Sequence, residues 1–309
     1  MSEKIATSIV GTVYNATESL AEFISKTKEI LGRQGEPFEI ILVDDRCPSG
    51  SWALIEKECL KDPVVKGVRL SRNFGQQIAT SVGLRFAKGE YVIMMDTDLQ
   101  TPPEAIPAIL EKLAEGADAV YTVSKVRNNW IDEITSALFW FMVNKILRVG
   151  MVPNQLMMKG LSRRFLSVYN TYNERVRVVA GIVHDIGMQT AIIEVNNVRR
   201  KIGHGNYSIF KRLDLMVDIV LTISSRPLSF LINISFLLML GSFALGAFTS
   251  VSYFLYPDVP PGYSTLITVI TFFGSITLLV LGIIGRYLSN IYTEVRQRPL
   301  FITDGKINL

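Results

Sequence analysis

The chain of 309 residues is poor in cysteine, with only Cys47 and Cys59, whose spacing is not that of a metal site. This argues against a disulfide-stapled or zinc-binding protein and predicts two reduced cytosolic thiols. No Gly-x-Gly-x-x-Gly or Gly-x-x-x-x-Gly-Lys segment occurs, which counts against dinucleotide and P-loop sites. The net charge is +4, but no basic stripe is interleaved with aromatic residues, so we expect no nucleic-acid partner.

Charge is also missing from two long stretches, residues 227–257 and 259–285. Each is longer than the roughly 20 residues that span a bilayer, so the sequence predicts two transmembrane helices. A buried core helix is the alternative for one such stretch, but two in succession favour the membrane. Because the surrounding lipid is a binding surface, we also expect membrane lipid as a partner.

The basic residues predict how these spans are oriented. Lys211 and Arg226 precede the first span and Arg286 and Arg296 lie at the end of the second, whereas the loop 256–263 has no Lys or Arg. This asymmetry places both termini in the cytoplasm. The first ten residues carry no extended apolar core, which predicts no signal peptide and a cytosolic catalytic part.

Before residue 200, short apolar runs alternate with helix-forming segments. Strands are predicted over 5–13, 38–43, 66–70, 91–95, 117–123 and 190–195, and helices over 19–31, from 51 toward Leu60, and over 77–87. This alternation is typical of a mostly parallel, doubly wound α/β sheet.

Polar side chains follow three of the predicted strands, at the point where each strand ends. They are Asn15, Asp44 with Asp45, and Asp96 with Asp98. Ligands of open α/β sheets bind at the carboxyl ends of the strands, so these groups predict a nucleotide pocket. Carboxylates at Asp96 and Asp98 suit a hard divalent cation that also contacts substrate phosphates. An isolated Asp-x-Asp is more often a solvated turn, and the neighbouring polar strand ends favour the site.

Two further segments leave alternatives open. Residues 131–147 form an amphipathic helix that suits either the membrane interface or the face of the sheet. Residues 199–208 form a basic, glycine-containing loop just before a second amphipathic stretch, 209–225. Such loops are usually solvated, but its place beside the membrane favours binding of a lipid phosphate.

The ordered set of motifs resembles the family 2 glycosyltransferases, and within them the membrane-anchored polyprenyl-phosphate glycosyltransferases that include the dolichyl-phosphate mannose synthases. The segments that carry the resemblance are 13–15 with Glu18, 43–45, 71–76, 96–104, 205–208 and the paired spans with the tail 286–300. The resemblance implies a GT-A fold followed by a two-helix transmembrane hairpin. It also implies Mg²⁺ or Mn²⁺ and transfer of a sugar from a nucleotide diphosphate sugar, here expected to be UDP-linked, to polyprenyl (undecaprenyl) phosphate.

The motifs assign roles to individual residues. For the nucleotide sugar they indicate Tyr14, Asn15, Glu18, Asp44, Asp45, Arg72, Asn73, Gln76 and Asp96; for the metal, Asp96, Asp98 and Gln100; for catalysis, Asp98 and Asp185; and for the lipid phosphate, Arg177, Arg200, Lys201, Tyr207 and Ser208. We expect a homo-oligomer with three parts: a GT-A domain over 1–208, an amphipathic helix over 209–226, and the spans with their cytosolic tail over 227–309.

The sequence departs from the family pattern at Met157, which stands where an acidic residue is usual in a Gly-Asp-Phe-Arg type segment. Asp185, beside His184, is a candidate substitute, and a structural Asp is its alternative. Met157 therefore keeps a second function open: a catalytically impaired protein that binds nucleotide sugar and lipid phosphate. A processive polysaccharide synthase is disfavoured because two spans are few and no Gln-x-x-Arg-Trp motif occurs.

Overall fold

A computed structural model gives the structure of this protein. It describes residues 5–14, 17–124, 152–172, 174, 179–196 and 262–309, together with residues 141, 144, 236–238, 240, 241 and 244. The chain divides into two compact units, one formed by Met1–Asn206 with Arg298–Leu309 and the other by Tyr207–Gln297.

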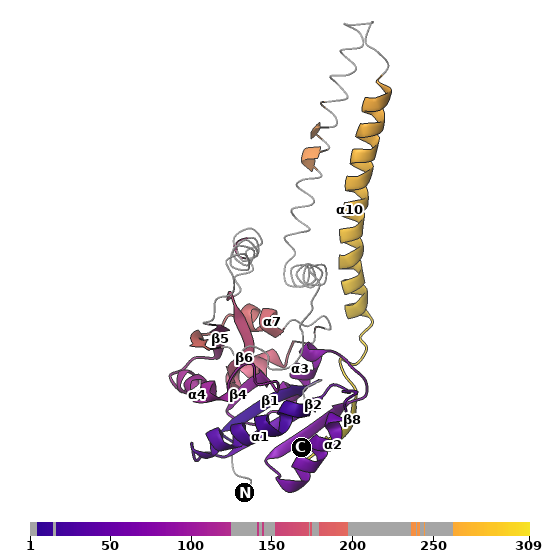
Figure 1. Ribbon diagram of the computed structural model, residues 1–309. Coiled ribbons are helices and arrows are strands. Elements are labelled where there is room, and N and C mark those ends of the chain that lie inside the picture. The colour runs from indigo at the N-terminus through magenta and orange to yellow at the C-terminus, as the bar shows by residue number, and fades with distance from the viewer. Residues whose placement is uncertain are drawn as a thin grey trace. The chain divides into compact units, whose positions relative to one another are not determined.

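In the first unit, strands and helices alternate through the first 124 residues (Figure 1). The elements are β1 (Thr7–Val13), α1 (Thr17–Gly32), β2 (Phe38–Asp44), α2 (Ser51–Lys61), β3 (Val65–Leu70), α3 (Gln76–Phe86), β4 (Tyr91–Asp96), the 3-10 turn η1 (Pro103–Ala105), α4 (Ile106–Ala114) and β5 (Ala119–Ser124). Further along the chain come β6 (Gln155–Ser162), α6 (Arg163–Tyr169), α7 (Val179–Ile186), β7 (Thr190–Val195) and, last, β8 (Thr303–Ile307).

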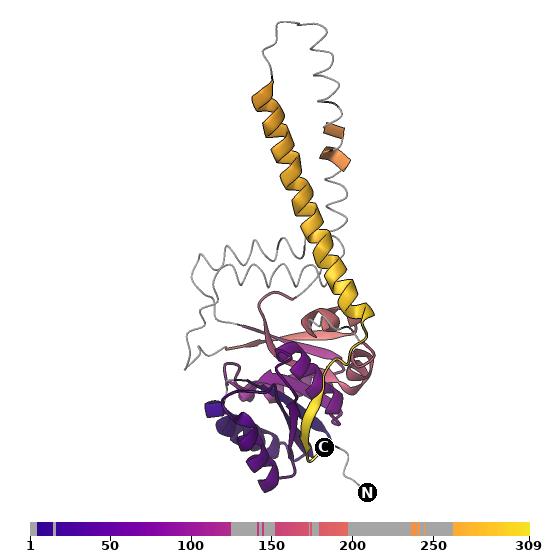
Figure 2. The same cartoon turned by 90° about the vertical axis from the view of Figure 1, so that its right-hand side faces the viewer.

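The strands form one eight-stranded sheet in the order β7-β5-β6-β4-β1-β2-β3-β8. β6 runs antiparallel to β4 and β5, and β8 runs antiparallel to β3, whereas the remaining neighbours are parallel. The predicted doubly wound, mostly parallel sheet is therefore confirmed. β8 comes from the end of the chain, and Figure 2 shows it as a yellow strand against the purple ones.

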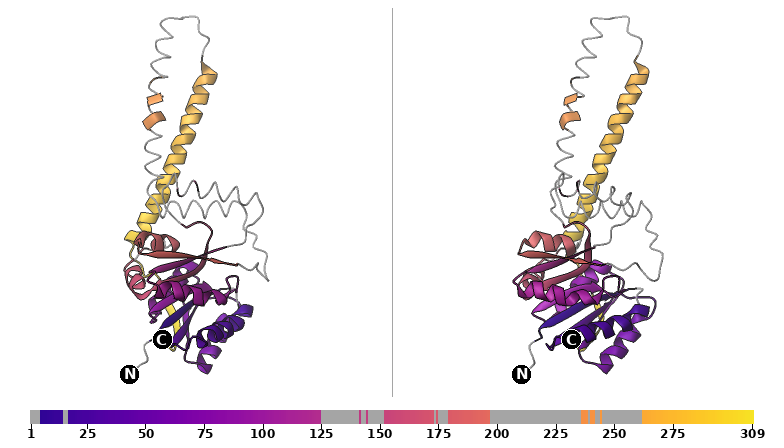
Figure 3. Two further views of the ribbon diagram at one scale, coloured as in Figure 1. Left: turned by 90° about the vertical axis from the view of Figure 1, so that its left-hand side faces the viewer. Right: turned by 60° about the vertical axis from the view of Figure 1, so that its left-hand side comes forward.

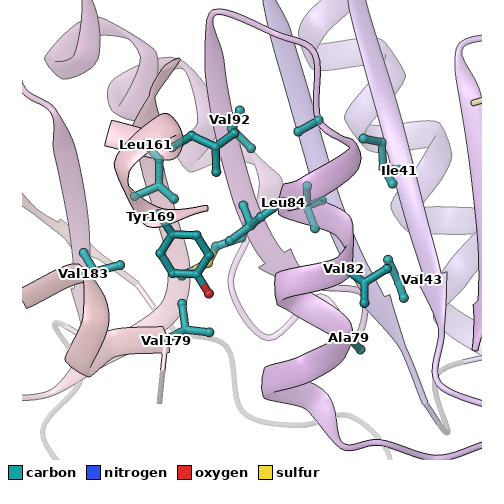
Figure 4. Packing of buried hydrophobic residues seen from close by; sticks show 14 of the residues in the cluster. Ile41, Val43, Ala79, Val82, Leu84, Val92, Leu161, Tyr169, Val179 and Val183 are labelled. Carbon is teal, nitrogen blue, oxygen red and sulfur yellow. The ribbon is translucent and has the colours of Figure 1, made fainter. Parts of the chain in front are cut away.

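Helices cover both faces of this sheet, because its central strands are apolar on both sides. The indigo α1 and the pink α6 and α7 lie on opposite sides of the strands (Figure 3). One buried cluster joins α1, α2 and α4 to the sheet, and the other joins α3, α6 and α7 to it. In the second cluster Tyr169 lies among Leu161, Val179 and Val183 (Figure 4). Its buried hydroxyl hydrogen-bonds with Oγ of Ser81 over 2.9 Å, which satisfies the polar end of the ring.

The second unit contains α10 (Tyr263–Val295), whose part Phe272–Val295 is long and apolar enough to cross a membrane. Leu278 and Leu288 are among its exposed large apolar side chains. A helix with exposed apolar side chains along its length suits lipid rather than water. The first charge-free stretch is described only at residues 236–238, 240, 241 and 244, which are helical.

Some elements of the first unit were not predicted, among them β6, α7 and β8. The last of these lies in what the sequence suggested was only a cytosolic tail. Ser162 begins α6 by accepting a hydrogen bond from Phe165 N over 3.1 Å, and the side chain of Arg163 donates to Ala87 O over 3.0 Å. The amphipathic segment 209–225 lies outside the described residues, and segment 131–147 is described only at residues 141 and 144.

Candidate active site

The sheet order puts the ends of β2, β1 and β4 side by side. Val13 pairs with Asp44 across β1 and β2, and Thr12 pairs with Asp96 across β1 and β4. The direction in which the chain adds strands reverses between β1 and β4, and a reversal of this kind opens a ligand crevice at the carboxyl ends of the strands. The acidic groups predicted to converge therefore follow adjacent strands.

The turn after β4 is held in place by hydrogen bonds of Thr97. Thr97 is buried and donates from Oγ1 to Thr12 O over 2.9 Å, while its own carbonyl accepts from Ser19 Oγ over 2.8 Å. At Gly11 a Cβ atom would meet Thr97 Cγ2 at 2.8 Å, so only glycine lets the turn approach β1 this closely. Thr97 is thus fixed, and the carboxylates of Asp96 and Asp98 on either side of it are half-buried.

Asp98 is oriented by Gln100 within the same turn. The backbone N–H of Gln100 donates to Asp98 Oδ1 over 3.0 Å, and its side-chain Nε2 donates to Oδ2 over 2.7 Å. These bonds stabilise the charged carboxylate and leave Oε1 of Gln100 as a neighbouring oxygen.

Asp44 and Asp45, at the end of β2, are both buried. Asp44 Oδ1 accepts from Cys47 N over 3.2 Å and from Ser51 Oγ over 2.8 Å, and Oδ2 lies 3.6 Å from Arg69 Nε in an ion pair. These contacts hold the turn into α2. In this arrangement Asp44 orders the turn into α2, and its direct contact with a nucleotide stays a prediction.

Asp45 holds a different segment. Its two oxygens accept from the consecutive backbone amides of Phe74 and Gly75 over 2.7 and 2.8 Å. Burial raises the pKa of Asp45, and the two amide hydrogen bonds oppose that rise. Gly75 has φ 92°, a region that favours glycine, and α3 begins directly after it.

The same segment reaches the other acidic group. Gln76, the first residue of α3, donates from Nε2 to Asp96 Oδ1 over 2.5 Å. The stretch 74–76 therefore bonds to Asp45 after β2 and to Asp96 at the end of β4, on either side of β1. This contact joins the predicted nucleotide and metal residues into one site.

The oxygen donors of this site fit a hard cation. Asp96 and Asp98 supply carboxylates, and Gln100 supplies an amide oxygen beside them. No group of three His, Cys, Asp or Glu residues able to hold a metal occurs among the residues that the structure describes. This donor set suits Mg²⁺ or Mn²⁺, which one or two carboxylates hold together with substrate phosphates.

Lys159 was missed by the sequence analysis. It lies on β6 opposite Met94 of β4, is 2 % exposed, and donates to Leu156 O over 2.7 Å. Burial lowers the pKa of Lys159 to about 8, and the charge of Asp96 opposes this shift. A lysine inside the otherwise apolar run 156–161 was the available signal, but only strand pairing shows that it lies near the site.

The other predicted site residues differ in their burial and in their contacts. Tyr14, Glu18, Arg72 and Asn73 are not buried, and the Arg72 guanidinium stacks 4.2 Å from the ring centre of Phe74. Asp185 is exposed on α7 and accepts from Tyr172 Oη over 2.9 Å. The predicted residues outside the described part of the chain are Asn15, Arg177, Arg200, Lys201, Tyr207 and Ser208.

A cavity of about 690 Å³ lies at the amino ends of the strands, and residues such as Ile5, Phe38 and Tyr91 line it. These residues lie at or just before the start of β1, β2 and β4, far along each strand from Asp44 and Asp96. The cavity is therefore separate from the acidic centre.

Residues 8–170 match the Glycosyl transferase family 2 family. The chain belongs to glycosyltransferase family 2. The match covers β2 and β4 with the turns that follow them, which together carry Asp44, Asp45, Asp96 and Asp98, and it ends just after α6. The protein is therefore a glycosyltransferase, as the motifs predicted.

Relatives extend the similarity of this family 2 glycosyltransferase over nearly the whole chain. It is 32 % identical to the uncharacterized glycosyltransferase YkcC of Bacillus subtilis, over 98 % of this chain and 94 % of YkcC. It is 31 % identical to the undecaprenyl-phosphate 4-deoxy-4-formamido-L-arabinose transferase of Pectobacterium carotovorum, over 97 % and 93 % of the two chains. The group of glycosyltransferases that the motifs resembled is thus confirmed.

A solved structure supports the GT-A type of fold. The mannosyltransferase PcManGT from Pyrobaculum calidifontis, in complex with GDP-Man and Mn²⁺, matches with a TM-score of 0.51 at 14 % identity. The match covers 94 % of this chain and 85 % of that one. At this identity the likeness shows the fold alone.

Proposed function

We propose that this glycosyltransferase moves a sugar from a nucleotide diphosphate sugar, UDP-linked, to the phosphate of a polyprenyl carrier at the cytoplasmic face of the membrane. The observation that carries the proposal is the Gln76–Asp96 hydrogen bond, which joins two acidic strand ends into one site. The name of the Pectobacterium relative, an undecaprenyl-phosphate transferase aligned over 97 % of this chain, supports the lipid acceptor.

In this proposal Asp96, Asp98 and Gln100 hold Mg²⁺ or Mn²⁺, which when bound neutralises charge on the leaving diphosphate. Gln76 and Gln100 orient the two carboxylates, and Asp45 holds the backbone of residues 74 and 75 against the pocket. Tyr14, Asn15, Glu18, Arg72 and Asn73 are assigned to the nucleotide sugar, and Arg177, Arg200, Lys201, Tyr207 and Ser208 to the lipid phosphate.

The acceptor needs little help from a base. The second pKa of a phosphate monoester lies near 6, so the acceptor is already largely ionised at neutral pH. Met157, half-buried on β6, therefore does not forbid transfer. Asp185 is assigned the role of substitute acidic group.

We also propose two membrane spans, with both termini cytoplasmic. Because β8 pairs with β3, the residues after α10 lie on the same side of any membrane as the N-terminal strands. A chain that leaves and rejoins one sheet crosses the membrane an even number of times. α10 supplies one candidate span, and the charge-free stretch 227–257 supplies the second.

This topology is tested by labelling single cysteines with a membrane-impermeant maleimide in intact cells. Gly262→Cys should react from outside, whereas Lys306→Cys should react only after the cells are permeabilised. Labelling of Lys306→Cys in intact cells would contradict the cytoplasmic location of the C-terminus.

The activity is tested with the purified full chain, UDP- and GDP-sugars, Mn²⁺ and undecaprenyl phosphate. Release of nucleotide diphosphate that requires the lipid supports the enzyme. Binding of a nucleotide sugar without any lipid-dependent release would instead support the impaired binding protein, which the Met157 departure keeps open. The homo-oligomer stays a prediction, and a measurement of the molecular mass of the protein in detergent tests it.

A further inference from the structure

The last strand of the chain contacts the segments that carry the predicted donor-binding residues. β8 follows α10 after a short connection, residues 296–302, and pairs along β3 at the edge of the sheet. Ile302 and Asp304 contact two different segments that carry predicted donor-binding residues, and Gly305 lies close to Trp52 of α2. The C-terminal strand therefore does more than complete the edge of the sheet: it also contacts loops of the candidate site.

Asp304 lies in a β-bulge of β8. Gly305 pairs with Arg69 and Thr303 with Leu70, so Asp304 between them has no partner on β3. A β-bulge of this kind redirects the side chain of the extra residue. The carboxylate of Asp304 forms an ion pair with Arg46, the residue directly after Asp45. Arg46 has φ 56°, a backbone conformation uncommon for a residue with a side chain.

Ile302 and Gly305 reach two more parts of the donor side. The Ile302 carbonyl accepts from Ser71 N over 2.9 Å, at the start of the segment that carries Arg72 and Asn73. A Cβ atom at Gly305 would meet Trp52 Cζ2 at 3.1 Å. The guanidinium of Arg69, paired with Asp44, lies 5.7 Å from the centre of the Trp52 ring.

The strand itself is held in place by other residues. Asn308 Nδ2 donates to Cys59 O over 2.7 Å and to Val65 O over 2.9 Å. Phe301 and Leu309 pack against the buried cluster of α3. The position of β8 thus does not depend on Asp304, so a change at Asp304 can be read as a change in the loop that Arg46 belongs to.

We propose that β8 is a positioning element of the donor site, in which Asp304 holds the loop after Asp45 through Arg46. The inference rests on the proposed function, because it presumes that this loop binds a nucleotide. The segment that follows the predicted membrane spans then fixes the shape of the pocket that receives the sugar nucleotide. Neither Asp304 nor Arg46 was assigned a role by the family motifs.

The test measures UDP binding by calorimetry and the two KM values of the full chain. Exposed ion pairs contribute little to global stability, so we expect Asp304→Asn to keep the Tm of the wild type while UDP affinity falls about two- to fivefold. Asp304→Arg, which opposes two positive charges, should lower affinity further. The donor KM should rise in parallel, while kcat and the KM for undecaprenyl phosphate stay unchanged.

The charge exchange Arg46→Asp with Asp304→Arg should restore UDP affinity to within about twofold of the wild type, since it rebuilds the pair with opposite polarity. Lys306→Met is the matched control, because Lys306 lies on the same strand but stacks on Phe86. UDP affinity unchanged in Asp304→Arg, or no recovery in the exchange, overturns the positioning role. A wild type that binds no nucleotide would overturn the proposed function instead.

Discussion

Gln76 donates a hydrogen bond to Asp96 over 2.5 Å, and the two residues lie 20 residues apart in sequence, at the start of α3 and at the end of β4. Through the preceding amides of Phe74 and Gly75, the same segment is bonded to Asp45. The residues predicted to bind the nucleotide and those predicted to bind the metal therefore contact one short segment of backbone, and disturbing this segment should affect both.

Replacing Gln76 with Leu should lower kcat/KM about tenfold. A hydrogen bond to a charged group contributes roughly 1.5–3 kcal/mol, and its loss removes the constraint that Gln76 places on the orientation of the Asp96 carboxylate. Initial rates at varied donor and Mn²⁺ concentrations measure the effect. Gln34→Leu, a change at an exposed glutamine beyond the end of α1, is the control and should behave as the wild type. Equal kcat/KM for both variants would mean that Gln76 does not orient Asp96.

Removing the metal should abolish transfer. EDTA should stop the release of nucleotide diphosphate, and added Mn²⁺ should restore it. Asp98→Asn should weaken Mn²⁺ binding and activity together by about 100-fold or more, since losing a group that only orients a metal ligand already costs about 10- to 100-fold. Electron paramagnetic resonance of free Mn²⁺ measures binding independently of turnover. Full activity in EDTA would rule out the metal role of Asp96 and Asp98.

Asp185→Asn tests whether this carboxylate replaces the acidic group that is missing at Met157. If it does, kcat should fall about 100-fold or more, within the range of general acid–base contributions, while the donor KM stays unchanged. Tyr172→Phe is the matched control, because it removes the hydrogen bond to Asp185 and keeps the carboxylate. Unchanged turnover of Asp185→Asn at saturating substrates would leave Asp185 a structural partner of Tyr172.

The parts of this fold that the sequence predicted are those with local signals. β1, β2 and β4 are apolar runs that end in polar turns, and each appears within a few residues of its expected place. β6 and β8 carry no such signal, because Gln155, Lys159, Asp304 and Lys306 interrupt their apolar pattern. Their pairing depends on β4 and β3, which lie far away in sequence, so only the folded sheet shows it.

The candidate site divides in the same way. Asp96 and Asp98 could be found because they follow a buried strand, and Asp44 and Asp45 because they follow another. The hydrogen-bond partners of these carboxylates could not be predicted, because they are distant in sequence: Asp45 accepts from backbone amides about 30 residues away. Lys159 escaped notice for the same reason: its closeness to Asp96 is a consequence of antiparallel pairing between β4 and β6.

Lys159→Met should stabilise the protein most at neutral pH. Burial lowers the pKa of Lys159 to about 8 in the fold, whereas the unfolded chain has the ordinary value of 10.5. Between these values the unfolded state binds more protons, so the wild type gains stability as pH rises, by up to about 3 kcal/mol. The Tm advantage of the variant in detergent should therefore shrink from pH 7 to pH 10. Lys57→Met, at an exposed lysine of α2, should show no such trend. A constant advantage across this range would mean that Lys159 is not a buried cation.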